Sequence, residues 1–163
     1  IKTYPDFPKE GILYRDVLPV LQYPKVFSEL IEEMSKQNEV LDCDAFIGVD
    51  ARGFLLASAI ALKLSKPLIV ARKPNKLPGS IITKKYDLEY GSNSLTISED
   101  SIRNFNSFVV IDDLIATGGT IDCIDKILKS QNKKIIGLAV VIELIELKGR
   151  NRFDFPVFSQ IKY

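Results

Sequence analysis

The chain has 163 residues, of which 46% are apolar and 26% charged, a composition typical of one globular domain rather than a disordered chain. Its 22 basic and 21 acidic residues leave a net charge of +1, which excludes a general basic surface for a nucleic-acid backbone. The longest apolar run, residues 135–142, is far shorter than the ~20 residues that span a bilayer, so we expect no membrane protein.

The predicted elements begin with a proline-rich arm at residues 1–23, which we expect to be irregular. Apolar side chains at helical spacing predict a helix from Pro24 to about Lys36. Two further helices are predicted, at residues 54–64 and at about 119–128, where Ile121, Ile124, Ile127 and Leu128 share a face. Short, continuous apolar runs predict four buried strands, at 45–49, 67–71, 107–111 and 134–142.

Such strands alternating with helices indicate the α/β class, with a mostly parallel central sheet flanked by helices on both faces. We find no linker and no repeat, so residues 1–163 are predicted to form a single domain. Residues 80–97 differ because apolar and polar residues are mixed there. We expect this segment to be a flexible two-stranded flap inserted between core strands.

The sequence contains no histidine, which excludes Ser-His-Asp and Cys-His catalysis, histidine-ligated metal sites and a histidine proton shuttle. Any chemistry must therefore come from carboxylates, lysines, tyrosines or a metal ion carried by a substrate. The two cysteines, Cys43 and Cys123, form no C-x-x-C pair. Reduced thiols fit this spacing best, and we expect a cytoplasmic protein.

The most informative segment is the apolar strand at 107–111, followed by Asp112-Asp113 and the small-residue loop 116–120, which opens a helix. Ligands of open α/β sheets bind at the carboxyl ends of the strands, and free N–H groups at a helix start bind phosphate. The two aspartates can accept hydrogen bonds from sugar hydroxyls. The segment therefore predicts a sugar-phosphate site; the alternative is a plain turn with a threonine cap beside a solvated acid pair.

This segment resembles the 5-phosphoribosyl-1-pyrophosphate (PRPP) binding motif of the type I phosphoribosyltransferases. Further stretches resemble the adenine phosphoribosyltransferase branch of this family, in the same order along nearly the whole chain: residues 7–16, 50–54, 72–79, 86–91, 143–144 and 147–150. The resemblance implies the type I phosphoribosyltransferase fold, with an arm or hood at 1–23 that binds the base and a flap at 80–97. It also implies transfer of 5-phosphoribose from PRPP to adenine, giving AMP and pyrophosphate in purine salvage.

The matching positions of the family imply which residues bind the phosphates. The residues for PRPP and AMP are Arg52, Gly53, Asp112, Asp113, Ala116, Thr117, Gly118, Gly119 and Thr120. Those of the pyrophosphate loops are Asp50, Ala51, Arg72, Lys73 and Lys76. A guanidinium at Arg52 suits phosphate oxygens, and a purely structural arginine at a helix start is disfavoured by the helix dipole. Residues 72–76, taken alone, also fit a solvated charge cluster.

The resemblance further implies that Leu13, Tyr14 and Arg15 bind adenine. Glu89 would be the catalytic residue, which exchanges a proton with a ring nitrogen of the base, and Tyr90 would belong to the flap. Tyr14 stands where phenylalanine is usual, and its added hydroxyl needs a partner. Two structural alternatives stay open: Arg15 and Asp16 can form an ion pair, and Glu89 can be an exposed loop residue.

The family also implies Mg²⁺ carried by PRPP rather than held directly by the protein, and a homodimer in which the loop at 72–76 often reaches the neighbouring site. Glu10 stands where proline is common.

Two other functions compete with the adenine enzyme: a sister enzyme for guanine, hypoxanthine or xanthine, and a PRPP-sensing regulator or RNA-binding module without turnover. The absence of a basic surface and the presence of Glu89 favour the enzyme.

Overall fold

The structure is a computed structural model that describes the backbone of residues 1–88 and 91–163 and the side chains of residues 1–85 and 94–163. Its strands are β1 Lys2–Tyr4, β2 Tyr14–Asp16, β3 Ala45–Val49, β4 Leu68–Ala71, β5 Ile81–Leu88, β6 Gly91–Ser98, β7 Ser107–Ile115, β8 Lys134–Glu143 and β9 Val157–Lys162. Its helices are α1 Pro24–Met34, α2 Asn38–Asp42, α3 Arg52–Leu64, α4 Glu99–Ile102 and α5 Gly119–Lys129, with short 3-10 helices η1 Leu18–Gln22, η2 Ile145–Leu147 and η3 Gly149–Arg152.

Five parallel strands form the central sheet, in the order β4-β3-β7-β8-β9. The chain runs from β3 to β4 on one side and later returns to β7 on the other side. The order therefore reverses between β3 and β7, and ligands of such sheets bind outside the carboxyl ends of the strands at this reversal. The α/β class with a parallel sheet is confirmed.

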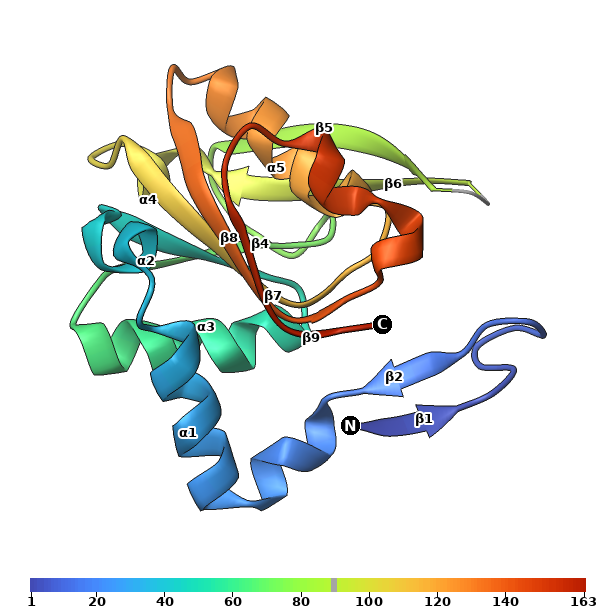
Figure 1. The fold of residues 1–163 in the computed structure, drawn as a ribbon. Helices are drawn as coiled ribbons and strands as arrows, with labels where there is room; N and C mark the ends of the chain where they lie inside the picture. The colour runs from blue at the N-terminus through green and yellow to red at the C-terminus, as the bar shows by residue number, and fades with distance from the viewer. Residues whose placement is uncertain (89–90) are drawn as a thin grey trace.

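Helices cover both faces of the sheet (Figure 1). Successive side chains of a strand point to opposite faces. On β3, Ile47 joins a buried core with α4, α5 and the β5–β6 hairpin, whereas Phe46 joins a second core with α1, α2 and α3. Each strand is thus buried on both sides, which explains the continuous apolar runs.

The N-terminal arm contains more regular structure than we predicted. β1 and β2 pair antiparallel, with Tyr4 opposite Tyr14. The hairpin lies beside the C-terminal end of the chain in Figure 1, and the guanidinium carbon of Arg15 lies 3.5 Å from the centre of the Tyr163 ring. The arm is therefore fixed to the carboxyl end of the sheet by a cation–π contact.

The segment at 80–97 is the two-stranded hairpin that the sequence predicts, β5 paired antiparallel with β6. Its base belongs to the core, because Leu95 and Ile97 are buried. A bridge between Arg72 and Thr96 ties it to the loop after β4, with N–H···O distances of 2.9 and 2.7 Å.

Some element ends differ from the predictions. Helix α1 ends at Met34, and β7 continues to Ile115, past the two aspartates, because its ladder with β8 pairs Asp112 with Val140 and Ile115 with Glu143. Strand β9, at the edge of the sheet, has no counterpart in the prediction. Within residues 1–88 and 91–163, no helix combines the length and the apolar character needed to cross a membrane.

Candidate functional site

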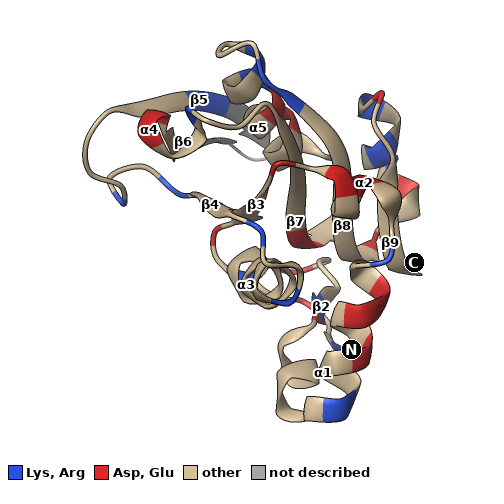
Figure 2. Cartoon of the chain, turned by 90° about the vertical axis from the view of Figure 1, so that its left-hand side faces the viewer, with Lys and Arg blue, Asp and Glu red and all other residues tan. Residues whose placement is uncertain are grey.

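A cavity of about 270 Å³ lies at the carboxyl ends of β3 and β7, where the strand order reverses. Figure 2 shows the acidic end of β7 beside α3. The predicted phosphate and ribose residues that line the cavity are Asp50, Ala51, Arg52, Lys73, Asp112, Asp113, Ala116, Thr117, Gly118, Gly119 and Thr120. The structure thus brings together two loops that are about 60 residues apart in the chain.

The loop 116–120 connects β7 to α5. Gly118 precedes the first residue of the helix with φ +81°, a conformation that glycine adopts without steric cost. The turn aims the start of α5, with its free N–H groups, toward the cavity. On the far side of the loop, Gly149 packs against the carbonyl oxygen of Ala116 so closely that a Cβ atom would overlap it.

The two aspartates at the end of β7 have different surroundings. The Oδ1 atom of Asp112 accepts a hydrogen bond of 2.8 Å from the backbone N–H of Asp113. Burial, and then the charge of Asp113, raise the pKa of Asp112 well above its usual value. Burial also raises the pKa of Asp113, against the opposing effect of Arg52. The pair therefore binds protons more readily than two solvated carboxylates would.

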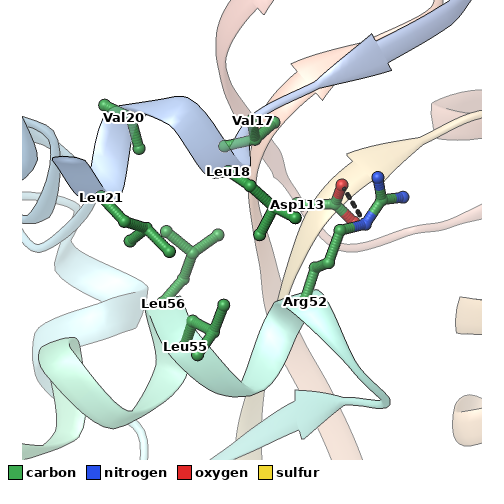
Figure 3. A pocket seen from close by; sticks show the side chains of 8 residues that line it. All are labelled: Val17, Leu18, Val20, Leu21, Arg52, Leu55, Leu56 and Asp113. Carbon is green, nitrogen blue, oxygen red and sulfur yellow. Dashed lines mark ion pairs between the residues drawn. The ribbon is translucent and has the colours of Figure 1, made fainter.

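Arg52, the first residue of α3, is the cation that faces these acids. Its Nε atom lies 3.0 Å from Oδ2 of Asp113, and its Nη1 atom donates a hydrogen bond to the hydroxyl of Tyr14. Figure 3 shows the ion pair beside apolar side chains of η1 and α3, among them Leu18 and Leu55. These apolar side chains border one side of the pair, while the side chain of Arg52 remains 31% exposed.

Asp50 organises the other cationic loop. Its Oδ2 atom accepts hydrogen bonds from Nε of Arg72, at 3.3 Å, and from the backbone N–H of Lys73, at 3.4 Å. Arg72 also donates through Nη1 to the carbonyl oxygen of Lys76, at 3.2 Å. Of the three predicted cations, only Lys73 lines the cavity, and the side chain of Lys76 is exposed.

The predicted adenine residues lie on the arm, outside this cavity. Tyr14 lines a second cavity of about 460 Å³ together with Tyr4, Pro5, Asp6, Phe7, Asp16 and Leu18. Leu13 is half exposed. Arg15 lies against Tyr163, while Asp16 accepts a hydrogen bond of 3.0 Å from the N–H of Leu18. In the described part of the chain, Arg15 and Asp16 thus form no ion pair with each other.

Two predicted residues, Glu89 and Tyr90, lie outside the described residues. Gly53, predicted to bind PRPP, lies behind the cavity wall, against the backbone of Ile111 and Asp112. Among the described residues, no cluster of three or more acidic or cysteine side chains is arranged so that it could hold a metal ion.

Sequence reasoning assigned no role to the residues that support the phosphate loop from behind. Arg152 donates to the carbonyl oxygen of Thr117, at 3.2 Å. Arg150 binds Glu143 through two hydrogen bonds of 2.5 and 2.7 Å, which lower the pKa of Glu143 to about 2. In the sequence, the indication that this region matters is the resemblance of residues 143–144 and 147–150 to the family. Leu95, from the hairpin, also lines the cavity.

Residues 20–162 match the family model of the phosphoribosyl transferase domain. An adenine phosphoribosyltransferase of Prochlorococcus marinus subsp. pastoris is 57% identical over 99% of this chain and 95% of its own. The crystal structure of adenine phosphoribosyltransferase from Thermoanaerobacter pseudethanolicus is 38% identical, with a TM-score of 0.93 over 100% of this chain and 95% of its own. The crystal structure of the Saccharomyces cerevisiae enzyme, which contains adenine, is 32% identical, with a TM-score of 0.88, and the match covers 98% of this chain and 93% of the yeast chain.

Proposed function

This chain belongs to the adenine phosphoribosyltransferase family, and we infer that it transfers 5-phosphoribose from PRPP to adenine, giving AMP and pyrophosphate. The observation that carries this assignment is the cavity at the strand reversal. There the start of helix α5, the two aspartates Asp112 and Asp113 and the guanidinium of Arg52 surround one space of about 270 Å³. The reaction belongs to purine salvage, because it returns a free base to the nucleotide pool.

The PRPP side of the reaction is assigned to the two loops of the cavity. The backbone N–H groups and threonine hydroxyls of residues 116–120 bind the 5-phosphate. Asp112 and Asp113 accept hydrogen bonds from the ribose hydroxyls. Because Asp113 is buried and Asp112 is only partly exposed, these bonds are made in a medium of low dielectric constant and position the sugar firmly.

The pyrophosphate leaving group is assigned to the cations at the opposite wall. Arg52 and Lys73 line the cavity there, and Asp50 holds the loop that carries Arg72, Lys73 and Lys76. Mg²⁺ would enter with PRPP, bound to its phosphate oxygen atoms, which are the ligand type that this ion prefers. When bound, the ion neutralises the charge that develops on the departing pyrophosphate.

Adenine is assigned to the arm, where Leu13, Tyr14 and Arg15 frame the base. Support comes from the second cavity beside Tyr14, and from Nε of Arg15, which is buried without a hydrogen-bond partner in the described part of the chain. Glu89 exchanges a proton with the base. The flap that carries Glu89 and Tyr90 closes over the site and excludes water.

We further assign a homodimeric state to the enzyme. The outer face of α3 exposes Leu55 and Leu62, which are 45% and 83% exposed, and Val26 of α1 is 50% exposed. Leu55 follows Arg52 by one helical turn, so a second copy docked on this face would lie beside the active site. Light scattering tests the dimer, and Leu62→Glu should shift it toward monomer.

The two free, buried thiols are compatible with action in the reducing cytoplasm.

The central experiment is incubation with Mg²⁺, PRPP and adenine, guanine, hypoxanthine or xanthine in turn, with nucleotide formation as the readout. AMP should form from adenine far faster than a nucleotide forms from the other bases. Asp113→Asn should weaken PRPP binding, whereas Asp122→Asn, on the neighbouring helix and paired with Lys126, is the matched control. Glu89→Ala should lower turnover while PRPP binding survives. PRPP binding without AMP formation would instead indicate a PRPP-sensing regulator.

A further inference from the structure

Tyr14 connects two parts of the site that are 38 residues apart in the chain. Its ring lines the cavity of the arm, and its hydroxyl accepts a hydrogen bond from Arg52, which lines the cavity of the sheet. The guanidinium carbon of Arg52 also lies 5.2 Å from the centre of the Tyr14 ring. One side chain thus borders the space assigned to the base and holds a cation that faces the space assigned to PRPP.

The guanidinium of Arg52 is held at two points. Nε faces Asp113 at 3.0 Å, and Nη1 donates to Tyr14. A guanidinium is a planar fork, so two fixed nitrogens determine the direction of the whole group. The side chain is 31% exposed, and an arginine with that much solvent contact has considerable rotamer freedom unless it is restrained. The hydroxyl of Tyr14 supplies one of the two restraints.

Tyr14 is itself held by its surroundings on the arm. The ring of Phe7 packs edge-on against it, with centroids 5.1 Å apart. The next residue, Arg15, points to the other face of β2 and lies on Tyr163. The hydroxyl is therefore presented to Arg52 from a fixed position, although the arm lies at the surface.

We propose that the hydroxyl of Tyr14 is a positioning group for Arg52, which orients the guanidinium toward the pyrophosphate of PRPP. This inference rests on the proposed function and adds to it a residue outside the PRPP cavity that sets the affinity for PRPP. Phenylalanine at this position keeps the ring that faces the base and removes only the hydroxyl that accepts the hydrogen bond from Arg52.

The test compares Tyr14→Phe with the unchanged chain and with Tyr23→Phe, a control on an exposed tyrosine outside both cavities. Calorimetry with Mg²⁺-PRPP should give about a 3- to 10-fold weaker Kd for Tyr14→Phe, the loss expected for one partly solvated hydrogen bond to a charged group. The KM for PRPP should rise by a similar factor, while kcat and the KM for adenine stay within about twofold.

A double-variant cycle shows whether the hydroxyl acts through Arg52. In an Arg52→Ala background, Tyr14→Phe should leave kcat/KM for PRPP unchanged. Equal losses in both backgrounds, a wild-type Kd for Tyr14→Phe, or the same loss in Tyr23→Phe would each overturn the inference. None of these results affects the proposed function, which fails only if the unchanged chain forms no AMP from PRPP and adenine.

Discussion

The PRPP cavity has two supports, each a buried carboxylate paired with a partly exposed arginine, and they differ in how completely the carboxylate is hydrogen-bonded. Behind the phosphate loop, the side chain of Glu143 is 5% exposed and accepts hydrogen bonds from Arg150 and from Ser159, the latter at 2.6 Å. In front, the side chain of Arg52 is 31% exposed and is held by Asp113 and Tyr14. The rear carboxylate has several hydrogen-bond partners and lies outside the cavity, whereas the front pair lines the cavity and faces the ligand.

This difference separates stability from function. A buried carboxylate that loses its partner keeps the cost of desolvation, so changes at the rear should destabilise the fold. At the front, the guanidinium of Arg52 lines the cavity, so changes to it should mainly alter ligand affinity. The rear support nevertheless reaches the ligand indirectly, because Arg150 follows Gly149, which packs against Ala116.

The largest effect is expected for Glu143→Gln, which should lower the free energy of unfolding at pH 7 by about 2–3 kcal/mol. The folded-state pKa of Glu143 is about 2, below the ordinary value of about 4.3. Its contribution is therefore complete above about pH 4.3 and is lost as the pH falls toward 2. The difference in the free energy of unfolding between the variant and the unchanged chain should therefore decrease as the pH falls through that window. Urea titrations followed by circular dichroism measure it. Exposed Glu146→Gln is the control; equal stability of the two variants at pH 7 would contradict the assignment.

An intermediate effect is expected for Gly149→Ala. The added methyl group would overlap the carbonyl oxygen of Ala116 and lie 3.0 Å from the backbone nitrogen of Gly118, so the phosphate loop must move. We expect at least about a 10-fold loss of PRPP affinity, since forced overlap costs about 1–3 kcal/mol. Calorimetry measures this loss, with Asn151→Ala in the same 3-10 helix as control. Unchanged affinity would mean that the loop is not supported from behind.

The smallest effect is expected for Tyr163→Leu, which removes the ring under Arg15. A partly exposed cation–π contact contributes about 0.5–1 kcal/mol, so the melting temperature should change by only a few degrees. The KM for adenine should rise about two- to threefold, because the arm loses its contact with the C-terminal end. Tyr163→Phe keeps the ring and should behave like the unchanged chain. A large loss of stability would contradict this prediction and would mean that the contact between Arg15 and Tyr163 is needed for folding.

The sequence predicts the central sheet well because buried parallel strands leave continuous apolar runs. The run at 45–49 coincides with β3, and that at 134–142 differs from β8 by one residue. Strand β9 escapes prediction because Ser159 and Gln160 interrupt its apolar residues at the sheet edge. The three-residue strands of the arm are too short to show a period.

The candidate site was predictable as two loops but not as a set of contacts. The loops at 50–52 and 112–120 are recognisable in the sequence, because each places small and charged residues directly after an apolar strand. The contact between Tyr14 and Arg52 depends on how the arm folds back over α3, which no local pattern encodes. The pairing of Glu143 with Arg150 also escapes prediction, because an acid at the end of an apolar strand and an arginine in a polar segment each look like surface charge in the sequence.

The burial of both cysteines has a practical consequence for studying the arm. Burial raises the pKa of Cys43 to about 11 and also raises the pKa of Cys123, so neither thiol reacts readily with alkylating reagents at neutral pH. A cysteine introduced at exposed Glu10 would then be the preferred attachment point for a fluorophore. Fluorescence of the labelled enzyme, recorded as each substrate is added, would show whether the arm keeps its position during binding.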